Sequence, residues 1–499
     1  MNPVSRSPGS LFPFASFISR LERASLIYLA LPIVLWTAIW LKVVFALPLL
    51  LGMGWAGWMI VRREASPWIP SERVSAPRLP ALWTLLVIAG VAMLWALYAG
   101  AGGFTYQNPD WEKHSAILRD LIEAPWPVAF QIQDTHTPLV YYLAYYLPAA
   151  LVGKMLGWWW ASAFLWLWTA AGIFLAVTWF TLLIGRHFVL AAVFFVFANG
   201  LDFVGQRLVS DGAIPGGTDH IDWWAGWVFL CYPGHASQLG WAPQHSLAAW
   251  IVTGLIAVQL SWRRDISRYG FFVALTALWS PFTFIGLLPV LAIAALLLRG
   301  RGCFHPINLI GAVLVGVSVL YFGSTASTAP RGWQWRQFDF HLYANRFLLF
   351  HLFEWGIFFL FARELRRSQD PSLRILFWAV AVTLLTITFY RIGLYNDWCM
   401  RVSIPSLFLL WAGTARSFLR PPYTIETKLV LLLVFLGMLG SFPELLRAFS
   451  TERINPPPLE EQAHVVNIDP SIAHQYLGRK NSFFFTHLAR SNEGISVRP

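Results

Sequence analysis

Long apolar stretches separated by short polar segments constrain the fold of this chain more than any other feature of its sequence. They recur as far as residue 446, and several approach the ~20 residues that an α-helix needs to cross a bilayer. Of the 499 residues, 57% are hydrophobic and 12% are charged, whereas a soluble domain is about half apolar and about a quarter charged. The sequence therefore predicts an all-α polytopic membrane protein with roughly 12–14 transmembrane helices, outer-face loops and surface helices.

Basic residues lie in short blocks between the apolar stretches. The formal net charge of +11 would suit a nucleic-acid partner, but blocks placed in this way follow the positive-inside rule of membrane proteins. We therefore expect no nucleic-acid partner, and we expect the following blocks to face the cytoplasm: Arg62-Arg63, Arg263 to Arg268, Arg299 to Arg301, Arg363 to Arg374 and Arg416 to Lys428.

With these blocks inside, the chain divides into three parts. Residues 1–80 form an N-terminal cytoplasmic segment and a transmembrane hairpin, 81–446 a transmembrane core, and 447–499 a tail on the outer face. The stretch 138–157 fits either a re-entrant or surface helix or a full crossing. The long or polar loops all fall on the outer face, where we expect any chemistry to take place: 101–137, 200–244, 324–345 and 391–401.

The first outer loop is highly charged for a chain of this composition. Asn108 is suited to cap a helix that begins at Asp110, and the Asp110 carboxylate complements the positive end of that helix. Apolar side chains then recur on one face, which predicts an amphipathic helix on the outer membrane surface. A capped helix with solvated acids is the alternative interpretation. However, a carboxylate at this position also lies where a lipid-linked substrate would present its head group.

Polar residues elsewhere in the outer loops could support Asp110. Lys113 and His114 follow it by one helical turn, and Gln244-His245 lie at the entrance of a later helix. Asp134 and His136 could orient a substrate or bind a metal, although a polar turn anchoring the interface is the alternative. The sequence leaves the cofactor open, with a divalent cation as one candidate.

Two arginines in the last outer loop suggest an anion site. Arg391 and Arg401 flank a short turn that contains Asn396. Guanidinium groups bind phosphate through paired hydrogen bonds, so these residues could hold a phosphate or diphosphate. Arginines at helix boundaries also extend toward the aqueous interface without binding a ligand, which is the competing interpretation.

The stretch "NPDWEKH", which contains Asp110, and the later "DTHTPLVYYLAYYLPAALVGKMLG" resemble segments of the GT-C superfamily. Its members are membrane glycosyltransferases that use polyprenyl-phosphate sugars, and the second stretch looks like that of protein-mannosyltransferase-like and aminoarabinose-transferase-like enzymes. The chain differs from this pattern by an additional N-terminal hairpin and by Trp111, which stands where an adjacent acidic partner is expected.

The resemblance implies a multi-pass protein of the cytoplasmic (inner) membrane with its active site facing the periplasm or exterior. By analogy, Asp110 would be the general base that deprotonates the acceptor hydroxyl, with inversion at the sugar carbon. Polyprenyl-phosphate sugar, membrane lipids and a glycan, lipid or protein acceptor would be the partners.

Two other classes of function fit the composition. A transporter or flippase for a lipid-linked or small solute predicts ionisable residues deep within the spans. A non-catalytic envelope-assembly protein would instead bind a partner through its outer loops and tail. In the tail, Phe483-Phe484-Phe485 could dock on the protein's own outer surface or on another chain.

Overall fold

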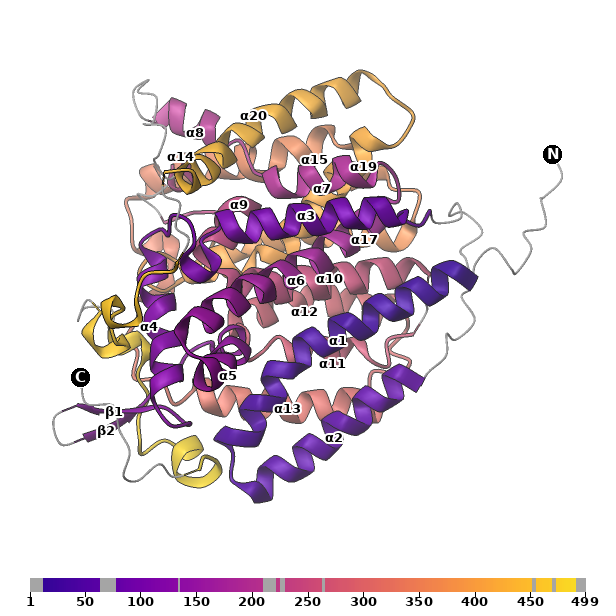
Figure 1. The fold of residues 1–499 in the computed structure, drawn as a ribbon. Coiled ribbons are helices and arrows are strands. Elements are labelled where there is room, and N and C mark those ends of the chain that lie inside the picture. Colours follow the sequence, from indigo (N-terminus) through magenta and orange to yellow (C-terminus); the bar gives the residue numbers. More distant parts are fainter. Residues whose placement is uncertain are drawn as a thin grey trace.

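Long helices run side by side through the molecule, and polar connecting segments collect at their ends (Figure 1). The structure, a computed structural model, describes residues 12–62, 78–132, 135–209, 221–224, 229–262, 265–450, 455–468 and 473–490. The chain is mostly helical. It begins with α1 (Phe12–Trp40), α2 (Val43–Arg62) and α3 (Leu82–Tyr98), of which α1 and α2 pack against each other.

Three helices form the centre of the bundle: α6 (Trp158–Ile184), α10 (Pro243–Trp262) and α19 (Ile404–Leu419). Each is apolar around most of its circumference, as expected of a helix covered on all sides. Gly254 of α10 lies so close to Trp179 of α6 that a Cβ atom there would approach the Trp179 side chain to 2.6 Å. A side chain at this position would therefore push the two central helices apart.

The other helices surround this centre or cap its ends. Before α14 they are α7 (Phe188–Phe197), α8 (Asp202–Val209), α9 (His235–Trp241), α11 (Tyr269–Leu275), α12 (Pro281–Leu297) and α13 (Pro306–Phe322). α14 (Phe340–His351) continues through a π-helical turn, Leu352–Gly356, into α15 (Ile357–Phe361). The last helices are α16 (Arg363–Arg367), α17 (Pro371–Ile387), α18 (Asp397–Val402) and α20 (Ile425–Ala448).

The described part of the chain contains six helices long and apolar enough to cross a membrane, together with shorter apolar helices such as α12 and α13. Large apolar side chains are exposed on the outer helices, among them Leu51, Leu86, Val319 and Leu432. Such side chains suit contact with lipid. The fold is therefore compatible with the predicted all-α membrane protein.

Contacts at one end of α6 identify the end of the bundle that carries basic residues. Arg416 and Arg420 follow the core of α19 and donate hydrogen bonds to the carbonyl oxygens of Leu183 (2.7 Å) and Ile184 (2.6 Å) at the end of α6. Arg416 also pairs with Glu364 at 3.1 Å. The C-terminal end of α6 thus meets the predicted block Arg416 to Lys428, which Glu364 links to the block Arg363 to Arg374, and we call this end of the bundle the basic end.

The stretch 138–157, left open by the sequence, does not cross the bundle. It contains α5 (Leu147–Leu156), whose ten residues extend only about 15 Å. Lys154 near its end donates a hydrogen bond to the carbonyl oxygen of Ile122 (2.9 Å), which lies in the last turn of α4 (Asp110–Glu123). α6 therefore starts at the end of the bundle where α4 lies, opposite the basic end.

Helix α4 forms where the cap and apolar pattern predict it, but its surroundings differ from the prediction. Asn108 accepts a hydrogen bond from the backbone N–H of Asp110 at 3.0 Å, as a capping residue does. The face expected to lie on lipid, which includes His114, is instead buried in the protein beside α5, and Asp120 on another side of the helix contacts the C-terminal tail. The polar side chains of α4 have hydrogen-bond partners within the protein, so the protein and not lipid covers this helix.

Two small sheets connect segments that were predicted to lie in outer loops, and neither sheet was predicted. β1 (Ala129–Ile132) pairs with β2 (Thr135–Pro138) in an antiparallel hairpin, with Gln131 opposite His136. β3 (Arg331–Trp333) pairs with β4 (Tyr390–Ile392), with Gly332 opposite Arg391. The second pairing joins the predicted loops 324–345 and 391–401.

The C-terminal tail, drawn in yellow in Figure 1, folds back over the end of the bundle that carries α4. The N–H of Arg490 donates to the carbonyl oxygen of Trp40 at 2.9 Å, and the N–H of Arg479 to that of Ser324 at 2.7 Å. Phe484 is fully buried, with its ring 5.8 Å from that of Trp36. The predicted apolar tail segment therefore docks on the protein's own surface.

Replacing Phe484 with alanine should loosen the tail, because it removes a fully buried ring, a change that costs about 3–5 kcal/mol. Phe483→Ala is the matched control, since that side chain is 58% exposed. Amide hydrogen exchange over 473–490 should rise in the first variant and stay at the wild-type level in the second. Equal protection in both variants would contradict this description of the tail.

Candidate functional site

A cavity of about 470 Å³ lies at the α4 end of the bundle. This volume is within the range of small-molecule sites, which is about 300–1,000 Å³. Residues from the start of α4, from the 223–241 region, from the 394–401 turn and from the tail line it together. They are Pro109, Asp110, Glu112, Lys113, Trp223, Cys231, Pro233, Ser237, Trp241, Leu394, Tyr395, Asp397, Met400, Arg401, Ile468, Gln475 and Tyr476.

The first turn of α4 contributes an ion pair to the cavity. Asp110 and Lys113 are three residues apart and therefore lie on the same face of the helix, where their side chains form a salt bridge. About 29% of the Asp110 side chain remains exposed. A molecule in the cavity can therefore reach the carboxylate while Lys113 holds its other side.

His114 supports α4 from behind the cavity. Its Nε2 lies 3.1 Å from the Trp241 carbonyl oxygen, which can only accept, so Nε2 carries the proton. Its Nδ1 therefore accepts from the Tyr146 hydroxyl. Burial, together with the charge of Lys113, lowers the pKa of His114 to about 3, so the ring is neutral near pH 7 and acts as a hydrogen-bonding support.

Another part of the cavity wall comes from a tight turn that leads into α18. Asn396 has φ +63°, a left-handed conformation that asparagine tolerates, and its side chain accepts from the N–H of Cys399 at 3.2 Å. At Gly393, a Cβ would meet an Asp397 oxygen at 2.3 Å, so only glycine fits. This turn directs Asp397 and Arg401 toward the cavity.

Arg401 is the cation of this wall. The residue is 8% exposed, and its Nε lies 3.8 Å from an Asp397 oxygen, a loose ion pair. Within the part of the chain that the structure describes, its guanidinium makes no hydrogen bond, and its Nε is buried without a partner. A buried N–H donor that makes no hydrogen bond is costly, and the Nε–H of Arg401 is such a donor. Arg401 is therefore prepared to bind an anion in the cavity.

The two carboxyl groups of the cavity ionise differently. Burial acts to raise the pKa of Asp110, but Lys113, His114 and Arg401 together bring it below its ordinary value. The pKa of Asp397 is raised, because its burial outweighs the nearby positive charges of Arg401 and Lys113. Asp110 is therefore an ionised carboxylate at neutral pH.

Arg391 and Asn396, the other predicted phosphate ligands, do not line the cavity. The Arg391 guanidinium donates to the carbonyl oxygens of Gly393 and Leu394 and to Oε1 of Gln337 (3.2 Å). The Asn396 amide donates to the Phe229 carbonyl oxygen at 2.9 Å. These hydrogen bonds stabilise the conformation of the turn, so both residues have a structural role beside the cavity.

The remaining predicted residues also lie outside the cavity lining. His136 is in the β1–β2 hairpin, and Asp134 falls outside the described residues. Gln244 is buried, and its amide lies 3.4 Å from the Tyr141 hydroxyl. His245 contacts the Ser280 hydroxyl at 2.6 Å and so ties the start of α10 to the start of α12.

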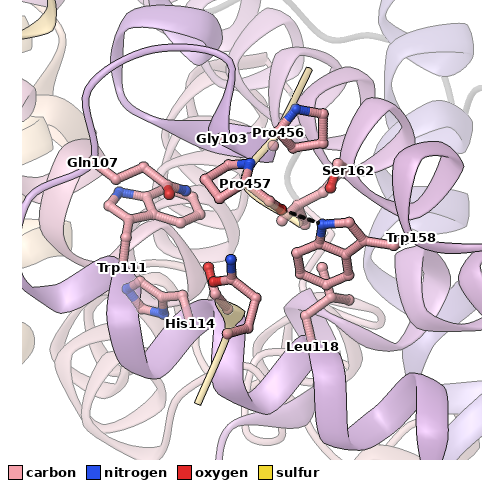
Figure 2. A pocket seen from close by; sticks show the side chains of 13 residues that line it. Gly103, Gln107, Trp111, His114, Leu118, Trp158, Ser162, Pro456 and Pro457 are labelled. Carbon is pink, nitrogen blue, oxygen red and sulfur yellow. Dashed lines mark hydrogen bonds between the residues drawn. The ribbon is translucent and has the colours of Figure 1, made fainter. Parts of the chain in front are cut away.

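The tail residues of the cavity were missed from the sequence. Figure 2 shows how the tail is held beside α4: Pro456 and Pro457 pass next to Trp158, whose indole N–H donates to the Pro457 carbonyl oxygen at 2.8 Å. Further on, Gln475 and Tyr476 reach the cavity. The signal that could have identified them is the polar and aromatic run "HQY" in a segment predicted to lie on the outer face.

Buried carboxyl groups also lie behind the cavity wall. Glu354, in the π-helical turn, accepts a hydrogen bond from the Trp224 indole at 2.7 Å, and Asp222 accepts from the N–H of Gly234 at 3.2 Å. Asp202 is likewise fully buried. Among the described residues, no group of three or more His, Cys, Asp or Glu side chains is arranged to hold a metal ion.

No known family pattern matches the chain, and no curated protein or solved structure is similar to it.

Replacing Arg391 with lysine should change the thermal stability of the protein, whereas replacing Arg401 with lysine should not. Arg391→Lys loses hydrogen bonds to three acceptors, each worth about 0.5–1.5 kcal/mol, so thermal unfolding should occur at a lower temperature. Arg401→Lys loses no hydrogen bond in the described structure and should unfold like the wild type. If Arg401→Lys were the less stable variant, the conclusion that the Arg401 guanidinium makes no hydrogen bond would be wrong.

Proposed function

We propose that this protein is a membrane glycosyltransferase. It would move a sugar from a polyprenyl-phosphate donor to a glycan, lipid or protein acceptor on the outer face of the cytoplasmic membrane. The observation that supports this best is the meeting of Asp110 and Arg401 around one cavity, although 290 residues separate them in the sequence. A base and an anion-binding group in one cavity are what glycosyl transfer from a phosphate requires.

The acceptor hydroxyl attacks the anomeric carbon of the donor and transfers its proton to the Asp110 carboxylate. The bond between that carbon and the phosphate oxygen breaks, and the electron pair leaves with the phosphate. Because attack and departure occur on opposite faces of the sugar, its configuration inverts.

The cations of the cavity have separate tasks in this reaction. The leaving phosphate gains negative charge as the bond breaks, so the fixed guanidinium of Arg401 stabilises the transition state more than the bound donor. Lys113 keeps Asp110 ionised and oriented. Trp241 offers an aromatic face to a sugar ring, and its indole is held by a hydrogen bond to Glu444 at 2.9 Å.

The orientation in the membrane follows from charge. The basic end of the bundle and the cavity lie at opposite ends of α6. With the basic blocks in the cytoplasm, the cavity faces the periplasm or exterior. There a lipid-phosphate sugar of the outer leaflet could enter from the side.

Asp110→Asn should lower turnover by about 10²–10⁴-fold, because an amide cannot accept the proton. The side chain keeps its size and loses only the charge that pairs with Lys113, so expression should match the wild type and stability should fall by no more than about 1 kcal/mol. Asp339→Asn is the matched control: Asp339 also lies at a helix start, accepting from the N–H of Leu342 at 3.0 Å, but outside the cavity lining. The measurement is sugar transfer by purified protein from polyprenyl-phosphate sugars.

The pH profile gives a second readout of the same experiment. A base works when ionised, and the lowered pKa of Asp110 places the loss of activity on acidification below the ordinary aspartate range of about 3.9. Near-normal turnover by the Asn variant would reduce Asp110 to a capping residue and remove the base from the mechanism.

A transporter or flippase is the second candidate, and the buried carboxyl groups favour it. Asp202 and Glu354 lie in candidate membrane spans, Phe188–Val209 and Phe340–Phe361, where an ionisable residue often marks a transport path. Translocation of a lipid-phosphate sugar by proteoliposomes, without formation of a glycosylated product, would favour this function over the transferase.

A further inference from the structure

The C-terminal tail completes the wall of the cavity. It is fixed on one side of the cavity by Asp120 of α4, which accepts hydrogen bonds from Nδ1 of His464 (2.5 Å) and from the N–H of Val465 (2.9 Å). On the other side, the N–H of Gly478 donates to the Pro138 carbonyl oxygen at 2.8 Å. Ile468, Gln475 and Tyr476, which lie between these anchors in the sequence, line the cavity.

Tyr476 is held more firmly than an exposed tail residue would be. Its carbonyl oxygen accepts from the N–H of Val140 at 2.8 Å, and the adjacent Leu477 forms a bridge with Leu139. Its ring meets that of Tyr141 edge-to-face at 5.0 Å. Backbone and ring are therefore both positioned, although the residue comes from the tail.

The hydroxyl of Tyr476 lies near the carboxylates of both walls but bonds to neither. Asp110 and Asp397 each act on it electrostatically, and together with its burial they raise the pKa of Tyr476 well above its usual value. None of the residues that the structure describes forms a hydrogen bond with this hydroxyl. It is thus a neutral group that can both donate and accept within the cavity.

We propose that Tyr476 is a substrate-binding residue whose hydroxyl hydrogen-bonds a hydroxyl of the transferred sugar. This inference rests on the proposed function. A sugar hydroxyl both donates and accepts, as the tyrosine hydroxyl does, and the two flanking carboxylates can accept from neighbouring sugar hydroxyls. The phosphate of the donor, in contrast, is bound by Arg401 at the α18 wall. The tail would therefore recognise the sugar and leave binding of the lipid phosphate unchanged.

The test compares Tyr476→Phe with Tyr343→Phe, a control that also removes a buried hydroxyl without a partner but lies outside the cavity lining. Binding is measured by microscale thermophoresis for two probes: polyprenyl phosphate, and the polyprenyl-phosphate hexose that the wild type binds most tightly. Tyr476→Phe should weaken hexose-donor binding about 3- to 10-fold and leave polyprenyl-phosphate binding unchanged. Tyr343→Phe should change neither affinity.

The outcomes separate this inference from the proposed function. Equal affinity of wild type and Tyr476→Phe for the hexose donor overturns the role of Tyr476, and so does an equal loss for both probes. A wild type that binds the donor but transfers no sugar overturns the transferase, while the binding comparison still decides the role of Tyr476. A wild type that binds neither probe overturns both.

Discussion

The carboxylate of Asp120 is the group on which the arrangement of the site depends. It is fully buried, and its two oxygens accept hydrogen bonds from the side chain of His464 and the backbone of Val465. A buried carboxylate without such partners would be strongly destabilising, so the tail must stay where it satisfies them. This contact fixes the tail to the helix that begins at Asp110, and it thereby brings Tyr476 to the same cavity.

The site combines side chains that are held by hydrogen bonds or ion pairs with a guanidinium whose hydrogen-bond donors have no partner among the described residues. Asp110 is bound to Lys113, and His114 is held through both ring nitrogens, so the α4 wall has little freedom. In the 391–401 turn, Arg391 uses its donors to shape the backbone, whereas Arg401 makes only a loose ion pair with Asp397 and no hydrogen bond to the described residues. A rigid turn that presents an unfilled guanidinium is pre-organised for an anion, because few groups need to move when the anion binds.

The features that could be predicted from the sequence are those that depend on residues close together in the chain. Apolar stretches located the long helices, and the cap at Asn108 located the start of α4. The sequence did not predict the tail contact, because Asp120 and Val465 are 345 residues apart and neither lies in a recognisable pattern. Nor did it separate Arg391 from Arg401, since their difference depends on the path of the backbone through the turn between them.

The most direct test of the account is an experimental structure of the protein in a lipid bilayer with bound polyprenyl phosphate. The account predicts phosphate density within hydrogen-bond distance of the Arg401 guanidinium, with the hydrocarbon chain leaving the cavity toward the membrane. Phosphate bound at the basic end of the bundle would contradict it. So would a cavity that the tail and the helices close off from the lipid on every side.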